Sequence, residues 1–164
     1  MPSRGVTGAF MAAVALMLVL GLALAAQPGE KKAKEMPAMK GRIMAMSKYP
    51  FNETVSQLKR AIEEQGLMVV FTADHQAMLQ MVGMQTKGMQ GIEFFHPKYG
   101  KVIAQNDHMA GIEIPFRLMV MEGDMGTMIA YYRPSHVFGK YLKLKALGRE
   151  LDGVVEKIAQ AVTK

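Results

Sequence analysis

The pattern of hydrophobic and polar positions after residue 40 predicts a strand, a helix and a second strand in succession. Residues 41–49 alternate as expected of a strand, and Pro50 ends the pattern. The next stretch has the spacing of an amphipathic helix between Asn52, a suitable N-cap, and Gly66, a stop signal. Its apolar face consists of Val55, Leu58, Ala61 and Ile62. A continuous apolar run at 67–71 then predicts a buried strand.

The second half of the chain predicts three more strands and a long C-terminal helix. Residues 89–95 are strand-like, and residues 112–121 form another strand pattern in which Pro115 indicates an edge position or a bulge. Residues 126–133 follow a turn and predict the return strand of a hairpin. Helix predominates from Ser135 onward. Its last part has an apolar stripe formed by Leu147, Leu151, Val154, Val155, Ile158 and Val162.

Two segments between these elements have weaker patterns. Residues 75–84 suit a short helix or an irregular crossing, and residues 98–110 suit a loop or a short helix. The order is therefore β-α-β4-α, which predicts one α+β domain over residues 41–164 with a mainly antiparallel sheet and helices packed on one face. We expect a core that contains Val55, Leu58, Ile62, Val69, Phe71, Ile92, Phe94, Leu118, Val120, Ile129, Leu151, Val155 and Ile158.

The first 40 residues have a different character. Residues 5–26 carry no charge, follow Arg4 and end in small residues with an A-x-A pattern, which together predict a cleaved secretion signal at residues 1–25. The rival interpretation is an uncleaved membrane anchor, because a run of this length could span a bilayer. Residues 26–40 are polar and rich in lysine, and they predict a charged linker. We therefore expect an exported protein, periplasmic or secreted.

The amino-acid composition excludes several kinds of functional site. The 164-residue chain has no cysteine, which excludes disulfides, zinc–thiolate sites, thiol redox chemistry and covalently attached haem. Its formal net charge is +6, and the basic linker favours contact with anionic membrane headgroups. Solvated helix faces are the simpler explanation of the remaining charge. An exported location argues against a nucleic-acid partner.

Several short motifs follow the predicted elements in a fixed order. They are Ser47, Phe51-x-x-Thr54-Val55, Asp74-His75, Phe95-His96-Pro97-Lys98, Ile114-Pro115-Phe116 and Tyr131-Tyr132-Arg133-Pro134. In order and spacing, they resemble the family catalogued as domain of unknown function 302, over residues 43–141. The resemblance implies a β-α-β4-α fold similar to the TATA-binding-protein-like group, and it brings no biochemical activity. The family pattern has Gly-Asn where this chain has Phe95-His96.

Methionine is unusually frequent, with 17 residues in the chain. Thioether sulfur is a soft ligand that suits Cu(I) and needs no deprotonation. Met78, Met81 and Met84 are three residues apart, a spacing that would align them along one side of a helix. The competing interpretation is that methionine is a flexible core filler, which fits Met119 and Met121 closely.

These residues lead to a functional hypothesis. His75 lies one helical turn before Met78, and His96 lies in the loop that departs from the family pattern. We therefore expect a small ligand-binding protein, with copper as the specific candidate ligand, held by His75, Met78, Met81, Met84 and His96. No catalytic motif occurs and no two carboxylates are marked as partners, so we expect no enzyme. The alternatives are a structural or interaction protein that could act as a homodimer, and a non-covalent haem binder.

Overall fold

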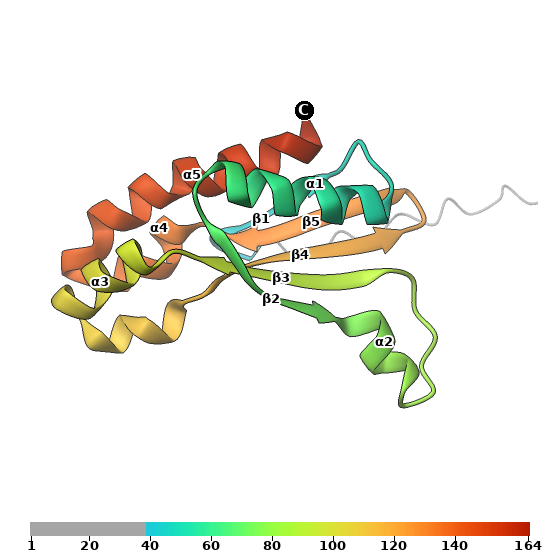
Figure 1. Cartoon of the computed structure of the whole chain (residues 1–164), viewed down its shortest axis with the longest axis horizontal. Helices are drawn as coiled ribbons and strands as arrows, with labels where there is room; N and C mark the ends of the chain where they lie inside the picture. Colours follow the sequence, from blue (N-terminus) through green and yellow to red (C-terminus); the bar gives the residue numbers. More distant parts are fainter. Residues whose placement is uncertain (1–38) are drawn as a thin grey trace, which may run out of the picture. The chain divides into compact units, whose positions relative to one another are not determined.

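The computed structural model describes residues 39–164. The predicted secretion signal and nearly all of the predicted linker therefore lie outside the described residues. The described part forms a five-stranded antiparallel sheet with its long helices on one face (Figure 1), so the predicted α+β architecture is confirmed. Within residues 39–164, no helix combines the length and the apolar character needed to cross a membrane.

The sheet has every neighbouring pair of strands antiparallel, in the order β1-β5-β4-β3-β2. Its strands are β1 (Arg42–Met46), β2 (Met68–Asp74), β3 (Met89–Phe95), β4 (Phe116–Gly123) and β5 (Gly126–Tyr132). Strands β1 and β2, which flank the first helix in the sequence, are thus the two edges. The tight connection between β4 and β5 is the predicted hairpin.

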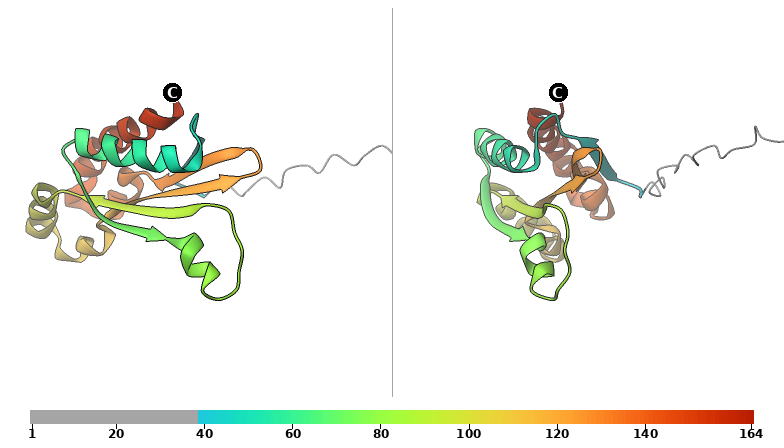
Figure 2. Two further views of the ribbon diagram at one scale, coloured as in Figure 1. Left: turned by 45° about the vertical axis from the view of Figure 1, so that its right-hand side comes forward. Right: turned by 90° about the vertical axis from the view of Figure 1, so that its right-hand side faces the viewer.

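Two long helices cover one face of the sheet, α1 (Phe51–Glu64) and α5 (Lys145–Thr163), and they lie side by side (Figures 1 and 2). The shorter helices are α2 (His75–Gln80), α3 (Pro97–Asn106) and α4 (Pro134–Val137), with 3-10 turns η1 (His108–Glu113), η2 (Phe138–Lys140) and η3 (Leu142–Leu144). The segment 75–88, which contains α2 and the loop that returns to β3, projects from the sheet and is called the arm below (Figure 1).

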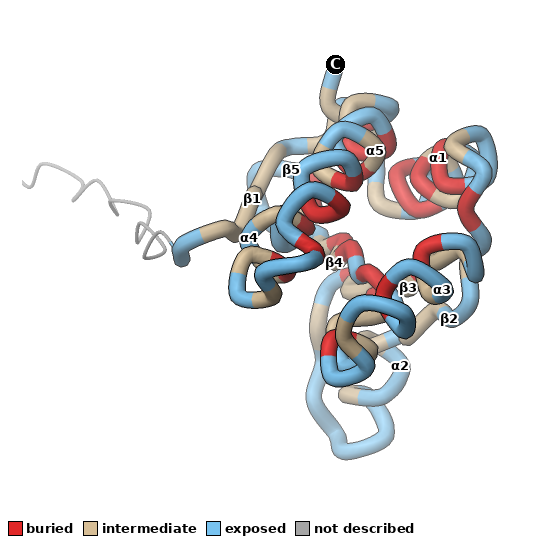
Figure 3. The backbone as a smooth tube through the Cα atoms, turned by 90° about the vertical axis from the view of Figure 1, so that its left-hand side faces the viewer, coloured by how far each residue is buried: buried red, intermediate tan, exposed pale blue. Residues whose placement is uncertain are grey.

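The core lies between the sheet and the two long helices. Buried residues are concentrated on the sides of α1 and α5 that face inward (Figure 3), whereas α2 has no buried residue. Every predicted core residue except Val69 and Phe71 is buried, as the periodicity of the elements required.

Phe71 is an error of the sequence prediction, because its side chain is 53% exposed. Val69 pairs with Phe94, but Phe71 pairs with Glu93 rather than with Ile92, since the register shifts between Val69 and Phe71. A bulge of one extra residue moves the following side chains to the other face of a strand. Phe71 therefore leaves the core, and Val69 is only half-buried.

Element boundaries differ from the prediction in two further places. Helix α1 begins at Phe51 with Pro50 as its N-cap, so Asn52 is not the cap. Strand β4 begins at Phe116, and Pro115 precedes it instead of lying at an edge position or bulge within it. Proline has no N–H to donate to a ladder, which is consistent with a place before the strand.

Candidate functional site

The face of the sheet opposite α1 and α5 is called the open face here. Side chains that alternate with core residues along a strand point to this face. The strand register aligns them in rows that run across the sheet. The first row is Met46, Met128, Met121 and Met89 on β1, β5, β4 and β3. The second row is Met44, Ala130, Met119, Gly91 and Ala73, from β1 to β2.

The first row brings four thioether side chains into a continuous strip. Directly opposite residues in an antiparallel sheet have Cβ atoms about 5 Å apart, so each methionine lies beside the next. Beyond the second row, Glu93 pairs with Arg117 on one side and with Phe71 on the other. The Glu93 carboxylate accepts hydrogen bonds from Arg117, and the two form an ion pair.

Methionine is absent from the core of the described region. None of the 22 buried apolar residues within 39–164 is methionine, and neither is any partly buried apolar residue packed against them. The interpretation of Met119 and Met121 as core filler is therefore wrong. Leu118 and Val120, which alternate with them, are fully buried. The thioethers of Met119 and Met121 instead line a hollow of about 360 Å³ on the open face.

His75, the first residue of α2, places its ring over the open face. Its Nε2 lies 3.3 Å from the point that a Cβ atom on Gly91 would occupy. The Gly91 position belongs to the open face, because the next residue of the strand, Ile92, is buried on the core face. Within the described part of the chain, neither ring nitrogen of His75 has a hydrogen-bond partner. The adjacent Asp74 carboxylate does not orient the ring but caps α2, accepting from the Ala77 N–H at 2.9 Å.

The arm carries the three methionines predicted as ligands, and all three are exposed. Met78 is 49% exposed, Met81 is 86% exposed and Met84 is 54% exposed. None of them serves as packing inside the domain. Lys87 at the base of the arm forms an ion pair with Asp124 of the β4–β5 turn at 2.5 Å, which lowers the pKa of the Asp124 carboxyl through the hydrogen bond and the charge of Lys87.

The helix of the arm ends before it can align these methionines. Gly83 has φ of 79°, and its N–H donates to the Gln80 carbonyl, while the Met84 N–H donates to the Leu79 carbonyl. This pair of bonds is a Schellman motif, which closes a helix and turns the chain away. Met84 therefore leaves the helical line, and Met78 is the predicted methionine ligand that shares α2 with His75.

His96 is not brought together with His75. It is the N-cap of α3, and its Nδ1 accepts a hydrogen bond from the Lys98 N–H at 3.0 Å. Asparagine is a preferred residue for the same capping role, so His96 fulfils the function that the Asn of the family pattern could perform. At the rise of about 3.3 Å per residue in a strand, His96 lies roughly 17 Å along β3 from Gly91.

Comparison with models of known protein families identifies the family of this chain. The family model described as Domain of unknown function DUF302 matches residues 43–164. The chain belongs to this family. The match includes the motifs recognised in the sequence and extends through α5, and the DUF302 family carries no assigned activity in its description.

A solved structure shows the same fold. The crystal structure of the uncharacterized conserved protein DUF302 from Bacillus stearothermophilus matches with a TM-score of 0.67 and 18% sequence identity, over 76% of this chain and 97% of that chain. A search of the curated proteins finds no match to the chain. The function of this DUF302 domain must therefore be argued from its own residues.

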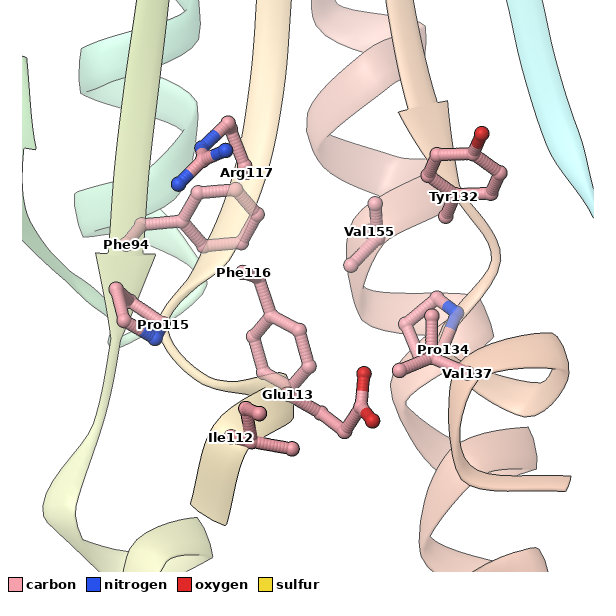
Figure 4. A pocket seen from close by; sticks show the side chains of 10 residues that line it. All are labelled: Phe94, Ile112, Glu113, Pro115, Phe116, Arg117, Tyr132, Pro134, Val137 and Val155. Atoms are coloured by element: carbon pink, nitrogen blue, oxygen red, sulfur yellow. The ribbon is translucent and has the colours of Figure 1, made fainter. Parts of the chain in front are cut away.

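A second feature of the DUF302 domain is a cavity of about 260 Å³ where β4 begins and β5 ends (Figure 4). Glu113 lines it, with a side chain 18% exposed, and Oε1 of its carboxylate accepts from the Tyr141 hydroxyl at 3.0 Å and pairs with Lys140 Nζ at 2.6 Å. Phe94, Phe116 and Val155 contribute apolar walls. The volume is below the range of about 300–1,000 Å³ usual for small-molecule sites. The carboxylate already has two partners, so the cavity is the weaker candidate.

Sequence reasoning did not connect His75 with the methionines on the neighbouring sheet strands. Within residues 39–164, no group of three or more histidine and carboxylate side chains is arranged to hold a metal ion. Met119, opposite Gly91, and the paired Met89 and Met121 are the thioethers beside His75. The available signal was the asymmetry within residues 118–121, where leucine and valine alternate with methionine.

Proposed function

We propose that this DUF302 protein is an exported binding protein that holds a soft metal ion, Cu(I), through thioether and imidazole ligands. The observation that carries the proposal is the distribution of methionine. In the described region methionine is excluded from the core, and most of its residues lie on the open face and the arm, with Met39, Met109 and Met125 exposed elsewhere. Thioether ligands select Cu(I) among the metal ions of proteins and remain neutral at every physiological pH.

Packing alone does not account for this distribution. A soluble domain buries its large apolar side chains where it can, and a strongly exposed methionine such as Met81 gains little from its environment. Leu118, Val120 and Ile129 show that the same hairpin places leucine, valine and isoleucine in the core. Some aliphatic residues of the described region are exposed as well, such as Ile112 and Leu142, but the hairpin places its aliphatic residues in the core and its methionines outside it, which supports a role for those methionines other than packing.

The donor set also predicts selectivity. Zinc sites are built from cysteine, histidine and carboxylate ligands, and the chain has no cysteine. The described residues offer His75 and neighbouring thioethers, and no cluster of three histidines and carboxylates. We expect Cu(I) and its redox-inert analogue Ag(I) to bind, and Zn(II) to bind much more weakly.

A direct test is an anaerobic titration of the purified protein in competition with a chromophoric Cu(I) chelator. The proposal predicts that the protein withdraws one equivalent of Cu(I), that Ag(I) displaces it, and that an equal concentration of Zn(II) does not. Failure to compete for either Cu(I) or Ag(I) contradicts the proposal. A Soret band in the protein as purified from cells would instead support the haem alternative.

Export is part of the proposal and has its own test. Thioether ligands cannot form disulfides, so such a site suits an oxidising compartment in which thiol ligands are lost. We expect the mature protein to begin near Gln27, after removal of the predicted signal, and the basic linker to contact anionic membrane surfaces. The intact mass of the protein recovered from the cell envelope tests this, and a mass that includes residues 1–25 favours the membrane anchor.

A protein-interaction function is the second candidate, because Val82 beside Met81 is 78% exposed and has no sulfur to offer a metal. Exposed apolar residues at the tip of a projection are typical of contact with a protein partner, including a second copy of the chain. Light scattering with and without Ag(I) separates the two functions. A metal-independent dimer supports the interaction function, and a monomer that binds Ag(I) supports the metal function.

A further inference from the structure

We infer that the metal ion is held on the open face by His75 together with Met119, Met121 and Met89, and not by the methionines of the arm. These four residues are called the His75 site. The inference rests on the proposed function and names the residues that perform it. The His75 site differs from the ligand set predicted from the sequence. Its three thioether ligands lie on strands of the sheet, and only the histidine lies on α2.

The first step is the position of the imidazole. His75 Nε2 lies 3.3 Å from the point where a Cβ atom on Gly91 would be, and Gly91 pairs directly with Met119 across β3 and β4. Opposite positions of this kind are about 5 Å apart at Cβ. The imidazole nitrogen thus lies within contact distance of the place where a Gly91 side chain would begin, on the strand position that pairs with Met119.

The second step is the position of the other thioethers. Met89 and Met121 pair with each other in the adjacent row, two residues from Gly91 and Met119 along their strands. Diagonal neighbours on one face of a sheet lie about 7–8 Å apart and remain within reach of long side chains. Methionine has three rotatable bonds, so the three sulfur atoms can converge beside the ring by rotamer changes.

The third step is access. Met119 and Met121 line the hollow of about 360 Å³, whose other lining residues lie on β1, β4 and β5, so an ion from solvent can approach these two side chains. His75 and Met89 do not line this hollow and lie towards β3 and α2. In the described region the His75 ring has no hydrogen bond that binding would have to break. The Asp74 cap holds the first turn of α2 in place and therefore holds the histidine backbone beside the sheet.

The charges around the site suit a monovalent ion. All four ligands are neutral when they bind, so a bound Cu(I) ion keeps a single positive charge. The nearest charged groups on the open face of β3 and β4 are Glu93 and Arg117, which already form an ion pair and offset each other. A divalent ion would leave twice the charge on a site with no anionic ligand, which disfavours it.

Two triple variants of equal size separate the face from the arm. The face variant combines Met89→Leu, Met119→Leu and Met121→Leu, and the arm variant combines Met78→Leu, Met81→Leu and Met84→Leu. Leucine nearly preserves volume, so both variants should fold. Loss of groups that merely support a ligand costs about 10–100-fold in metal affinity, so loss of the ligands themselves should lower Cu(I) affinity by more than about 100-fold in the face variant. The arm variant should change the affinity by less than about threefold.

The outcomes distinguish this inference from the proposed function. If the wild-type protein binds Cu(I) and the arm variant loses affinity while the face variant does not, the His75 site is wrong and the function stands. Equal affinities of both variants and the wild type also overturn the His75 site. If the wild-type protein binds neither Cu(I) nor Ag(I), the proposed function itself is wrong.

A second measurement does not depend on the stability of the variants. Titration of the wild-type protein with Ag(I), followed by the ¹⁵N resonances of the histidine side chains, should shift Nε2 of His75 and leave His96 unchanged. A spectrum in which His75 does not respond to a stoichiometric amount of bound Ag(I) overturns the assignment.

Discussion

The Nε2 atom of His75 lies 3.3 Å from the site of the missing Cβ atom of Gly91, a separation smaller than nine in ten real Cβ contacts. A methyl group at this position must push the imidazole aside by a few tenths of an ångström. We expect Gly91→Ala to lower Cu(I) affinity by about 10–100-fold, the range for residues that orient a metal ligand. The fold should be retained, because alanine is more favourable than glycine within a strand.

The matched control for this substitution is Gly111→Ala. Gly111 lies in η1, and a Cβ atom there would meet nothing within 4 Å. Competition titrations of both variants, with thermal unfolding as a check, should show reduced affinity for Gly91→Ala alone. The same affinity in the two variants would mean that the position of the His75 ring has no part in binding.

Thr54 predicts a large effect on stability from a single hydroxyl group. The residue is fully buried, and its Oγ1 lies 2.7 Å from Ser47 Oγ and donates to the Tyr49 carbonyl at 3.0 Å. Thr54→Val keeps the shape but removes the hydrogen bond to the Tyr49 carbonyl and one of the hydrogen bonds of Ser47 Oγ, at a cost of about 1–3 kcal/mol in the free energy of unfolding. Ser47 and Thr54 both belong to the family motif, which therefore serves the fold at this point.

Denaturant unfolding measures that change, with Ser56→Ala as the control. Ser56 is exposed and donates to the carbonyl of Asn52 within α1, an interaction that adds little to helix stability. We expect the control to alter the free energy of unfolding by less than about 0.5 kcal/mol. A similar small change in Thr54→Val would show that the buried hydroxyl network is not important for stability.

The bulge in β2 predicts a contrast between two phenylalanines. Phe94 is fully buried, and Phe94→Ala should cost about 3–5 kcal/mol in the free energy of unfolding. Phe71 lies beyond the bulge on the open face, so Phe71→Ala should cost less than about 1 kcal/mol. Equal losses of stability in the two variants would mean that Phe71 is buried in the core and that β2 has no bulge before it.

The ion pair between Lys87 and Asp124 predicts a pH dependence confined to the arm. Lys87 lowers the pKa of Asp124, so the pair contributes stability above the unfolded-state pKa of the carboxyl, and this contribution disappears as the pH falls through the lower folded-state pKa. Both side chains are exposed, so global stability should hardly change. In an NMR titration, Lys87→Gln should raise the pKa of Asp124 towards its ordinary value. An unchanged pKa would mean that the pair does not form in solution.

The fold was largely predictable because most elements have a single apolar face. Strand β3 has the bounds that the alternation in residues 89–95 indicates, and α1 buries Leu58 and Ile62 as its period requires. The position of Phe71 was not predictable, because the bulge moves the side chains after it to the other face of β2, and the continuous apolar run at 67–71 does not indicate where such a bulge lies.

The candidate site was only partly predictable from the sequence. His75 was identified from its spacing to the methionines that follow it. Leu118 and Val120 were correctly assigned to the core, but Met119 and Met121 were interpreted as core filler because the segment 118–121 is apolar on both faces. The proximity of His75 to Met119 depends on the pairing of β3 with β4 and on the side of the sheet that α1 and α5 cover. Both relationships join residues far apart in the chain, which local spacing does not determine.

Copper K-edge X-ray absorption of the Cu(I)-loaded protein tests the central claim most directly. Thioether and imidazole ligation predicts a dominant sulfur shell at about 2.3 Å with one nitrogen neighbour at about 2.0 Å, by analogy with other metal–sulfur and metal–imidazole distances. The face variant should lose the sulfur shell, and the arm variant should keep it. A shell of nitrogen and oxygen alone in the wild-type protein would contradict the claim that methionines of this domain bind the metal.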